Sequence, residues 1–151
     1  MGRKAKSRPT RAAKPRAQNA PLVLIVEDYE DAREMYAEYL KYAGFRVAEA
    51  CNGLEALDIA NELIPDVILM DLALPGMDGW EATRRLKAAE RTRRIPVIAV
   101  TGHALSGHSD TARKAGCDAF VSKPCLPDAL VAEVRKMLDT TRKTSRARNA
   151  T

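Results

Sequence analysis

The amino-acid sequence predicts an α/β fold in which a five-stranded parallel sheet is doubly wound, with helices on both of its faces. Two observations predict it: short apolar runs recur five times, and a segment with helical spacing follows each run. Near-continuous apolar runs are typical of strands that are covered on both faces. Regular alternation of strand and helix favours a parallel sheet, because right-handed crossover connections leave few other arrangements.

The boundaries of the elements follow from the apolar runs and from the stop signals between them. Strands are expected at residues 22–26, 45–50, 67–70, 95–100 and 119–121. Helices are expected at residues 30–42, 53–63, 79–89, 106–115 and 127–138. The stop signals are Gly44, Pro65 and Gly116, each of which follows a helical segment. The second strand is the weakest of the five candidates.

The distribution of charge divides the chain into three parts. Residues 1–20 hold seven Lys and Arg and no acid, and residues 141–151 hold four more bases. All 20 acids therefore lie in residues 21–140, against 14 bases, so this segment carries a net charge of −6. Because the two ends are polar and lack apolar periodicity, we expect a disordered basic arm at 1–20 and a disordered basic tail at 141–151. Residues 21–140 are long enough for one domain.

Composition also excludes several classes of protein. No apolar run approaches the roughly 18 residues of a membrane span, and the N-terminus lacks the apolar core of a signal peptide. The three cysteines are odd in number and have no C-x-x-C spacing, which favours free thiols over disulfides or a zinc site. A cytoplasmic protein without a membrane partner is expected.

Polar side chains follow four of the five predicted strands. Glu27 and Asp28 come after the first strand, Asp71 after the third, Thr101 after the fourth and Lys123 after the fifth. Each has an ordinary explanation when taken alone, such as a helix cap or a solvated surface. In a doubly wound sheet, however, ligands bind beyond the carboxyl ends of the strands. The joint placement therefore predicts one common crevice.

The types of residue in this crevice indicate its chemistry. Three carboxylates raise one another's pKa unless a cation lies among them. A ligand set made of oxygens, without His or Cys, favours Mg²⁺ or Mn²⁺ over zinc. Mg²⁺ keeps open positions that can bridge to a phosphoryl oxygen, while Lys123 and Thr101 offer a charge and a hydroxyl to the other phosphoryl oxygens. The pattern predicts a site that handles phosphate.

Four motifs together resemble the receiver domains of bacterial two-component response regulators. They are Val26-Glu27-Asp28, the stretch Asp71–Gly79, Val100-Thr101-Gly102 and Ser122-Lys123-Pro124. The resemblance covers about residues 22–139. It implies a flavodoxin-like fold, with five helices and the strand order 2-1-3-4-5.

The resemblance also implies a role for each residue of the crevice. Asp71 would be the phosphoacceptor and would form an acyl phosphate from a phosphohistidine or a small phosphodonor. Asp28 and Asp71 would bind Mg²⁺ directly, Glu27 would act mostly through water, and the Ala73 carbonyl would complete the protein ligands.

Further implied roles concern the phosphoryl group and the switch. Thr101 and Lys123 would hold the phosphoryl oxygens, and the Lys123-Pro124 peptide bond would be cis. Phe120 occupies the position of the family's switch aromatic, where tyrosine is common. A phenylalanine can rotate inward but offers no hydroxyl to a partner.

The implied function is a phosphorylation-dependent signalling switch in a two-component system or phosphorelay. A sensor histidine kinase or a histidine phosphotransfer protein would supply the phosphoryl group. No enzymatic activity is expected beyond self-phosphorylation and slow self-dephosphorylation. Because about 12 residues after Asp139 are too few for a DNA-reading domain, the output is expected to be a contact with a downstream protein effector. The last two helices and the last strand would make that contact.

Three other functions share part of this pattern. A relay shuttle that passes its phosphoryl group to a histidine phosphotransfer protein has the same motifs and stays open. A haloacid-dehalogenase-type phosphatase needs a second Asp two residues after its nucleophile, where this chain has Ala73. A nucleic-acid-associated regulator would use the basic arms to bind polyanions without sequence preference, and this alternative also stays open.

Overall fold

A computed structural model describes residues 19–102 and 115–150 of the 151-residue chain, except for the side chains of residues 144–150. The strands are β1 (Leu22–Val26), β2 (Arg46–Ala50), β3 (Val67–Asp71), β4 (Val97–Thr101) and β5 (Ala119–Ser122). All pair in parallel, in the order β2-β1-β3-β4-β5. The predicted fold class and strand order are confirmed.

The described residues form four helices. They are α2 (Glu30–Tyr42), α3 (Gly53–Leu63), α4 (Gly79–Ala88) and α6 (Pro127–Ala150). Each lies where a helix was predicted, within one residue at every end except the C-terminal end of α6. The helix expected at residues 106–115 lies, apart from its last residue, outside the described part of the chain.

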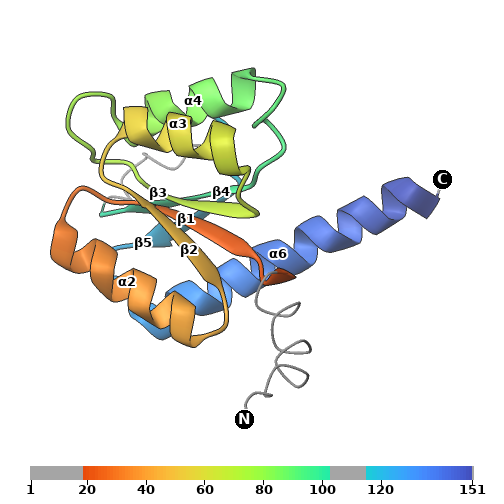
Figure 1. The fold of residues 1–151 in the computed structure, drawn as a ribbon, viewed down its shortest axis with the longest axis horizontal. Helices are drawn as coiled ribbons and strands as arrows, with labels where there is room; N and C mark the ends of the chain where they lie inside the picture. The colour runs from red at the N-terminus through yellow and green to blue at the C-terminus, as the bar shows by residue number, and fades with distance from the viewer. Residues whose placement is uncertain (1–18, 103–114, 151) are drawn as a thin grey trace, which may run out of the picture.

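Helices cover the sheet on both faces, α3 and α4 on one and α2 and α6 on the other (Figure 1). Successive strand residues point to opposite faces, so Leu24 and Val26 of β1 pack in the core under α3 and α4. Val23 and Ile25 pack in the core under α2 and α6. Because both faces are buried, β1, β3 and β4 consist entirely of buried residues, which explains their near-continuous apolar sequences.

Side-chain caps begin the two helices that follow β2 and β3. Asn52 accepts a hydrogen bond from the backbone N–H of Glu55 at 2.8 Å, and the Glu55 carboxylate accepts one from the N–H of Cys51 at 2.9 Å. Asp78 accepts from the N–H of Glu81 at 2.9 Å at the start of α4. The bonds from the Glu55 and Glu81 N–H groups satisfy backbone donors that the first turn of a helix leaves unpaired. Asp78 therefore fixes the beginning of α4 beside the carboxyl end of β3.

The last helix differs from the expectation of a disordered tail after about Thr141. α6 is 24 residues long and continues to Ala150, and Figure 1 shows its end projecting from the body of the domain. The sequence after Leu138 has no Gly or Pro to end a helix. The hydroxyls of Thr140 and Thr141 donate to carbonyl oxygens one turn back, both at 3.0 Å. No helix in the described residues is both long and apolar enough to cross a membrane.

Candidate functional site

Three carboxylates meet at the carboxyl edge of the sheet. Glu27 follows β1 and Asp71 ends β3, and their exposed fractions are only 5% and 3%, while Asp28 is exposed. One oxygen from each of the three lies within 4.8 Å of the others. The structure thus brings together the three acids that the sequence placed after two different strands.

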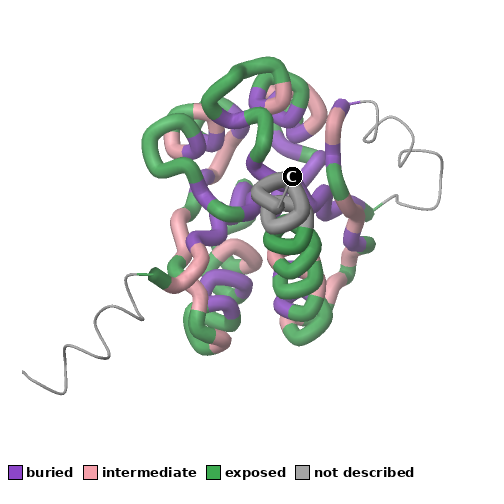
Figure 2. The backbone as a smooth tube through the Cα atoms, turned by 90° about the vertical axis from the view of Figure 1, so that its right-hand side faces the viewer, coloured by how far each residue is buried: buried purple, intermediate pink, exposed green. Residues whose placement is uncertain are grey.

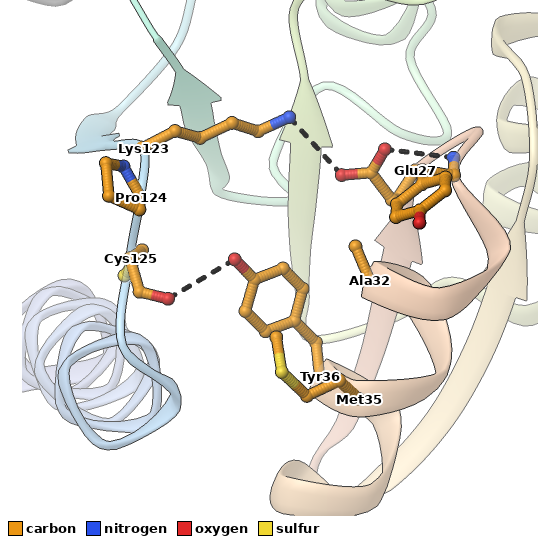
Figure 3. A pocket seen from close by; sticks show the side chains of 8 residues that line it. Glu27, Ala32, Met35, Tyr36, Lys123, Pro124 and Cys125 are labelled. Carbon is orange, nitrogen blue, oxygen red and sulfur yellow. Dashed lines mark hydrogen bonds and ion pairs between the residues drawn. The ribbon is translucent and has the colours of Figure 1, made fainter.

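Lys123 reaches these carboxylates from the end of β5. Its Nζ lies 3.1 Å from Oδ2 of Asp71 and 3.4 Å from Oε1 of Glu27, and Figure 3 shows the side chain extending toward Glu27. Its backbone N–H donates to the carbonyl of Thr101 at 2.8 Å, which holds the ends of β4 and β5 together. The Lys123-Pro124 peptide bond is cis, as the family resemblance implied.

The described residues do not balance the charges in the crevice on their own. Burial raises the pKa of the Glu27 carboxyl, and the Asp71 charge raises it too, although the Tyr29 N–H at 3.1 Å and the Lys123 ammonium oppose this. Burial lowers the pKa of Lys123, but its hydrogen bond to Asp71 and the two carboxylate charges outweigh that effect and raise it overall. In the part of the chain that the structure describes, one ammonium group thus faces three carboxylates in a partly buried crevice.

The crevice fits a hard divalent cation. Its candidate ligands are carboxylate oxygens alone, which suit Mg²⁺ or Mn²⁺ and not the nitrogen and sulfur sites that zinc prefers. The exposed Asp28 leaves one side open to water, and Mg²⁺ usually keeps several waters. Ala73 lies beside the carboxylates, and its N–H donates to Oδ1 of Asp71 at 2.9 Å.

A cavity of about 470 Å³ opens beside Asp71. Its lining residues are Asp71, Leu72, Ala73, Asp78, Trp80, Thr101, Gly102 and Lys123. Thr101 is the last residue of β4 and is 6% exposed. The cavity therefore places a carboxylate, an ammonium and a hydroxyl residue around a space with room for a phosphoryl group.

Phe120 lies apart from the crevice, in β5. It is half-buried, pairs in register with Ala99 of β4 and packs against the core on the side of α3 and α4.

Residues 103–114, which follow Thr101 and Gly102 in the chain, include His103, and they lie outside the described residues.

Sequence reasoning missed the tight packing at Gly79. A Cβ atom at this position would meet the backbone of β3, namely the Asp71 carbonyl oxygen and, at 2.8 Å, the Leu72 Cα. Glycine therefore lets the first turn of α4 pass against the backbone that carries Asp71. The Asp78-Gly79 pair was visible in the sequence as a helix start, but the close approach depends on the tertiary structure.

Two side chains of α2 that were not predicted also support the crevice. The Arg33 guanidinium donates to the Glu27 carbonyl at 2.9 Å and pairs with Glu49 at 3.2 Å. The Tyr36 hydroxyl donates to the Cys125 carbonyl at 3.3 Å, and both residues line the pocket shown in Figure 3, which is separate from the cavity beside Trp80. These contacts tie α2 to β1 and to the loop after β5. Helical spacing alone gave no signal for them.

Comparisons with known proteins agree on one family. The model for the response regulator receiver domain matches residues 23–135. The polar-differentiation response regulator DivK of Brucella anthropi is 40% identical over 116 residues, which cover 77% of this chain and 94% of that protein. A structure of the receiver domain of sensor histidine kinase PA1611 from Pseudomonas aeruginosa has a magnesium ion coordinated in its active-site cleft. It is 34% identical with a TM-score of 0.70, covering 80% of this chain and 96% of that one. Chemotaxis protein CheY4 of Vibrio cholerae is 26% identical with a TM-score of 0.74, covering 78% and 98%.

Proposed function

The chain belongs to the response regulator receiver domain family, and from this membership we propose that it is a phosphorylation-dependent switch whose phosphoacceptor is Asp71. The observation that carries the proposal is the setting of this carboxylate. Asp71 is buried at the end of β3, borders an open cavity and has the Lys123 ammonium 3.1 Å from its Oδ2. A sensor histidine kinase or a histidine phosphotransfer protein is the proposed donor.

The proposed reaction is a transfer of one phosphoryl group to the Asp71 carboxylate. A carboxylate oxygen forms a bond to phosphorus while the bond from phosphorus to the donor nitrogen or oxygen breaks. A departing nitrogen takes up a proton, whereas the acetate oxygen of acetyl phosphate leaves with the electron pair as the free anion. The Ala73 N–H holds Oδ1 and the Lys123 ammonium holds Oδ2, so the carboxylate is oriented before the donor arrives. Lys123 and Thr101, which line the cavity, would then hold the transferred oxygens.

A divalent cation is proposed to lie among the three carboxylates. Asp28 and Asp71 would bind it directly, Glu27 mostly through water, and the Ala73 carbonyl would be a further ligand. When bound, it supplies positive charge that stabilises the charge developing on the phosphoryl oxygens. The closeness of the three acids and the magnesium ion in the related PA1611 receiver domain support this choice, with Mn²⁺ as the alternative ion.

Phosphorylation from a small donor should require the metal. Incubation with acetyl phosphate or phosphoramidate is expected to add one phosphoryl group when Mg²⁺ or Mn²⁺ is present, because Lys123 alone cannot balance three carboxylates. Intact-protein mass spectrometry measures the labelling. Chelation with EDTA should stop it, and excess Mg²⁺ should restore it. Equal labelling with and without EDTA would contradict the proposed site.

No turnover on external phosphoesters is proposed. Position 73, two residues after the acceptor, is an alanine, so the general acid of a haloacid-dehalogenase-type phosphatase is absent from that position. The catalysis proposed is limited to self-phosphorylation and slow self-dephosphorylation.

Transfer of the label from Asp71 to a histidine phosphotransfer protein would make the chain a relay shuttle, whereas a phosphorylation-dependent complex with another effector would make it a terminal switch.

The conformational change caused by phosphorylation is proposed to reach the surface formed by β5 and α6 through the side chain of Phe120. A phosphoryl group in the cavity would draw the Thr101 hydroxyl toward it, and the half-buried Phe120 ring would turn inward to fill the space left behind. A few kcal/mol of differential binding is enough to shift such a two-state equilibrium strongly. A downstream effector would then recognise the changed surface, which was also expected to include residues 106–115.

Amide chemical shifts can test this coupling. With beryllofluoride as a phosphoryl mimic, shifts are expected to change at the crevice and also along β5 and α6. In Phe120→Ala the crevice changes should remain and the distant ones should be lost, because the ring that connects them is missing. Phe45→Ala, which removes the chain's other phenylalanine, should keep the response of β5. An unaltered distant response in Phe120→Ala would rule out this route.

A further inference from the structure

The end of α6 extends beyond the body of the domain. At Arg135 the helix reaches the amino edge of the sheet. The Arg135 guanidinium donates to the Ala43 carbonyl at 3.1 Å and lies 5.8 Å from the centre of the Phe45 ring. Ala43 and Phe45 come just before β2 in the chain. The last apolar residue that packs on the core is Leu138. We call residues 139–150 the α6 overhang. At a rise of 1.5 Å per residue it is about 18 Å long.

Solvent surrounds the first turn of the α6 overhang. The five consecutive residues from Asp139 to Lys143 are all exposed, and five positions more than complete one turn of a helix. Figure 2, which looks toward the C-terminal end of α6, shows these exposed turns. Residues 139–143 therefore do not pack on the domain and are open to a partner.

The charge of the α6 overhang is strongly one-sided. Its four bases are Arg142, Lys143, Arg146 and Arg148, and it has no acid after Asp139. Positions 142 and 146 are one turn apart on the same face, and 143 is adjacent to that face. Like charges one helical turn apart generally destabilise a helix, so a polyanion beside this stretch would stabilise it. The three carboxylates of the crevice lie at the opposite, carboxyl edge of the sheet, where they repel such a ligand least.

We propose that the α6 overhang binds the phosphate backbone of duplex DNA without sequence preference. This inference is separate from the phosphorylation proposed for Asp71. An α-helix, about 10–12 Å across, fits the major groove of B-form DNA, whereas the major groove of A-form RNA is too narrow and deep. The α6 overhang contains no aromatic residue to stack on single-stranded bases, and no large apolar residue to insert into a membrane surface.

The ordinary explanation for these bases is different. Cations near a helix C-terminus interact favourably with the helix dipole and keep a protein soluble. Under that explanation, any attraction to DNA would reflect the total charge of the protein and would not depend on where the bases lie. The two accounts therefore predict different results for charge removed at α6 and the same charge removed elsewhere.

Fluorescence anisotropy with a short, labelled DNA duplex of mixed sequence tests the proposal on the full chain. The triple variant Arg142→Gln, Lys143→Gln, Arg146→Gln is compared with a control, Arg84→Gln, Arg93→Gln, Arg94→Gln. The control loses the same charge from exposed positions in and after α4, on the other face of the sheet. The basic segment 1–18 is present in both, so its contribution cancels. Circular dichroism checks that both variants keep the helicity of the unmodified chain.

The salt dependence of binding gives the decisive comparison. A plot of log affinity against log salt has a negative slope, and in the α6 variant the magnitude of this slope is expected to decrease by about 2–3. Each phosphate that the helix no longer neutralises accounts for roughly 0.9 of this decrease. The affinity at low salt should decrease by about tenfold or more. The control should change the slope by less than about 1. Equal decreases in both variants, or no binding by the unmodified chain, would overturn the proposal. Equal or tighter binding of duplex RNA, or of vesicles containing phosphatidylglycerol, would overturn it as well.

Discussion

Replacing Asp71 with asparagine is expected to abolish phosphorylation by acetyl phosphate in the presence of Mg²⁺. The amide has nearly the same shape as the carboxylate, but it keeps only one acceptor oxygen. It can therefore accept one of the two hydrogen bonds that the Asp71 oxygens receive, from the Ala73 N–H at 2.9 Å and from the Lys123 ammonium at 3.1 Å. It carries no negative charge and is a poor nucleophile toward phosphorus. Intact-protein mass spectrometry should therefore show no added phosphoryl group in Asp71→Asn.

Asp78→Asn is the matched control for this experiment. Asp78 lines the same cavity, but its carboxylate caps α4, and asparagine caps a helix about as well as aspartate. This variant should be labelled like the unmodified chain. Urea denaturation should show that Asp71→Asn is no less stable without metal, because it removes a charge beside the buried Glu27. Full labelling of folded Asp71→Asn would show that another residue is the acceptor.

The sheet was predictable because burial leaves a strong local signal in the sequence. The central strands β1, β3 and β4 are buried along their whole length, so each reads as an apolar run. β2 lies at an edge of the sheet, with Arg46 and Glu49 exposed, and it was the weakest candidate for that reason. The crevice was predictable because parallel strands bring their carboxyl ends to one edge.

Contacts between residues far apart in the sequence were not predictable. The Asp66 carboxylate accepts from the backbone N–H of Leu22 at 2.7 Å, and Asp118 accepts from that of Val97 at 2.8 Å. These bonds hold the starts of β1 and β4, yet each Asp looks like an ordinary loop residue in the sequence. Such pairings depend on strand register and loop path, which a local pattern does not contain.

The continuation of α6 beyond Thr141 was not predicted, for a different reason. The expectation of a disordered tail rested on composition, since residues 141–151 are polar and basic and cannot form a core of their own. A helix already nucleated by packing, however, adds further residues at low cost, because nucleation is the unfavourable step. Leu130 and Val134 anchor α6 in the core, and no Gly or Pro stops the helix after them.

Gly79→Ala is expected to have the largest effect on stability among single changes near the crevice. The added methyl group would meet the Asp71 carbonyl oxygen and the Leu72 Cα, which are backbone atoms and cannot turn aside as a side chain can. Either α4 or the end of β3 must move. Overpacking of this kind costs about 3 kcal/mol, at the upper end of its usual range. Urea denaturation measures the decrease in the free energy of unfolding, and labelling of the displaced Asp71 should slow in parallel.

Gly102→Ala separates this steric effect from the general cost of replacing glycine near the crevice. Gly102 lines the same cavity, but a Cβ atom there would meet no atom of the described residues within 4 Å, and its φ lies outside the left-handed region. The free energy of unfolding should therefore change by less than about 0.5 kcal/mol, or rise slightly because alanine restricts the unfolded chain. Similar decreases in the two variants would show that the approach of α4 to the Asp71 backbone is not what requires glycine at position 79.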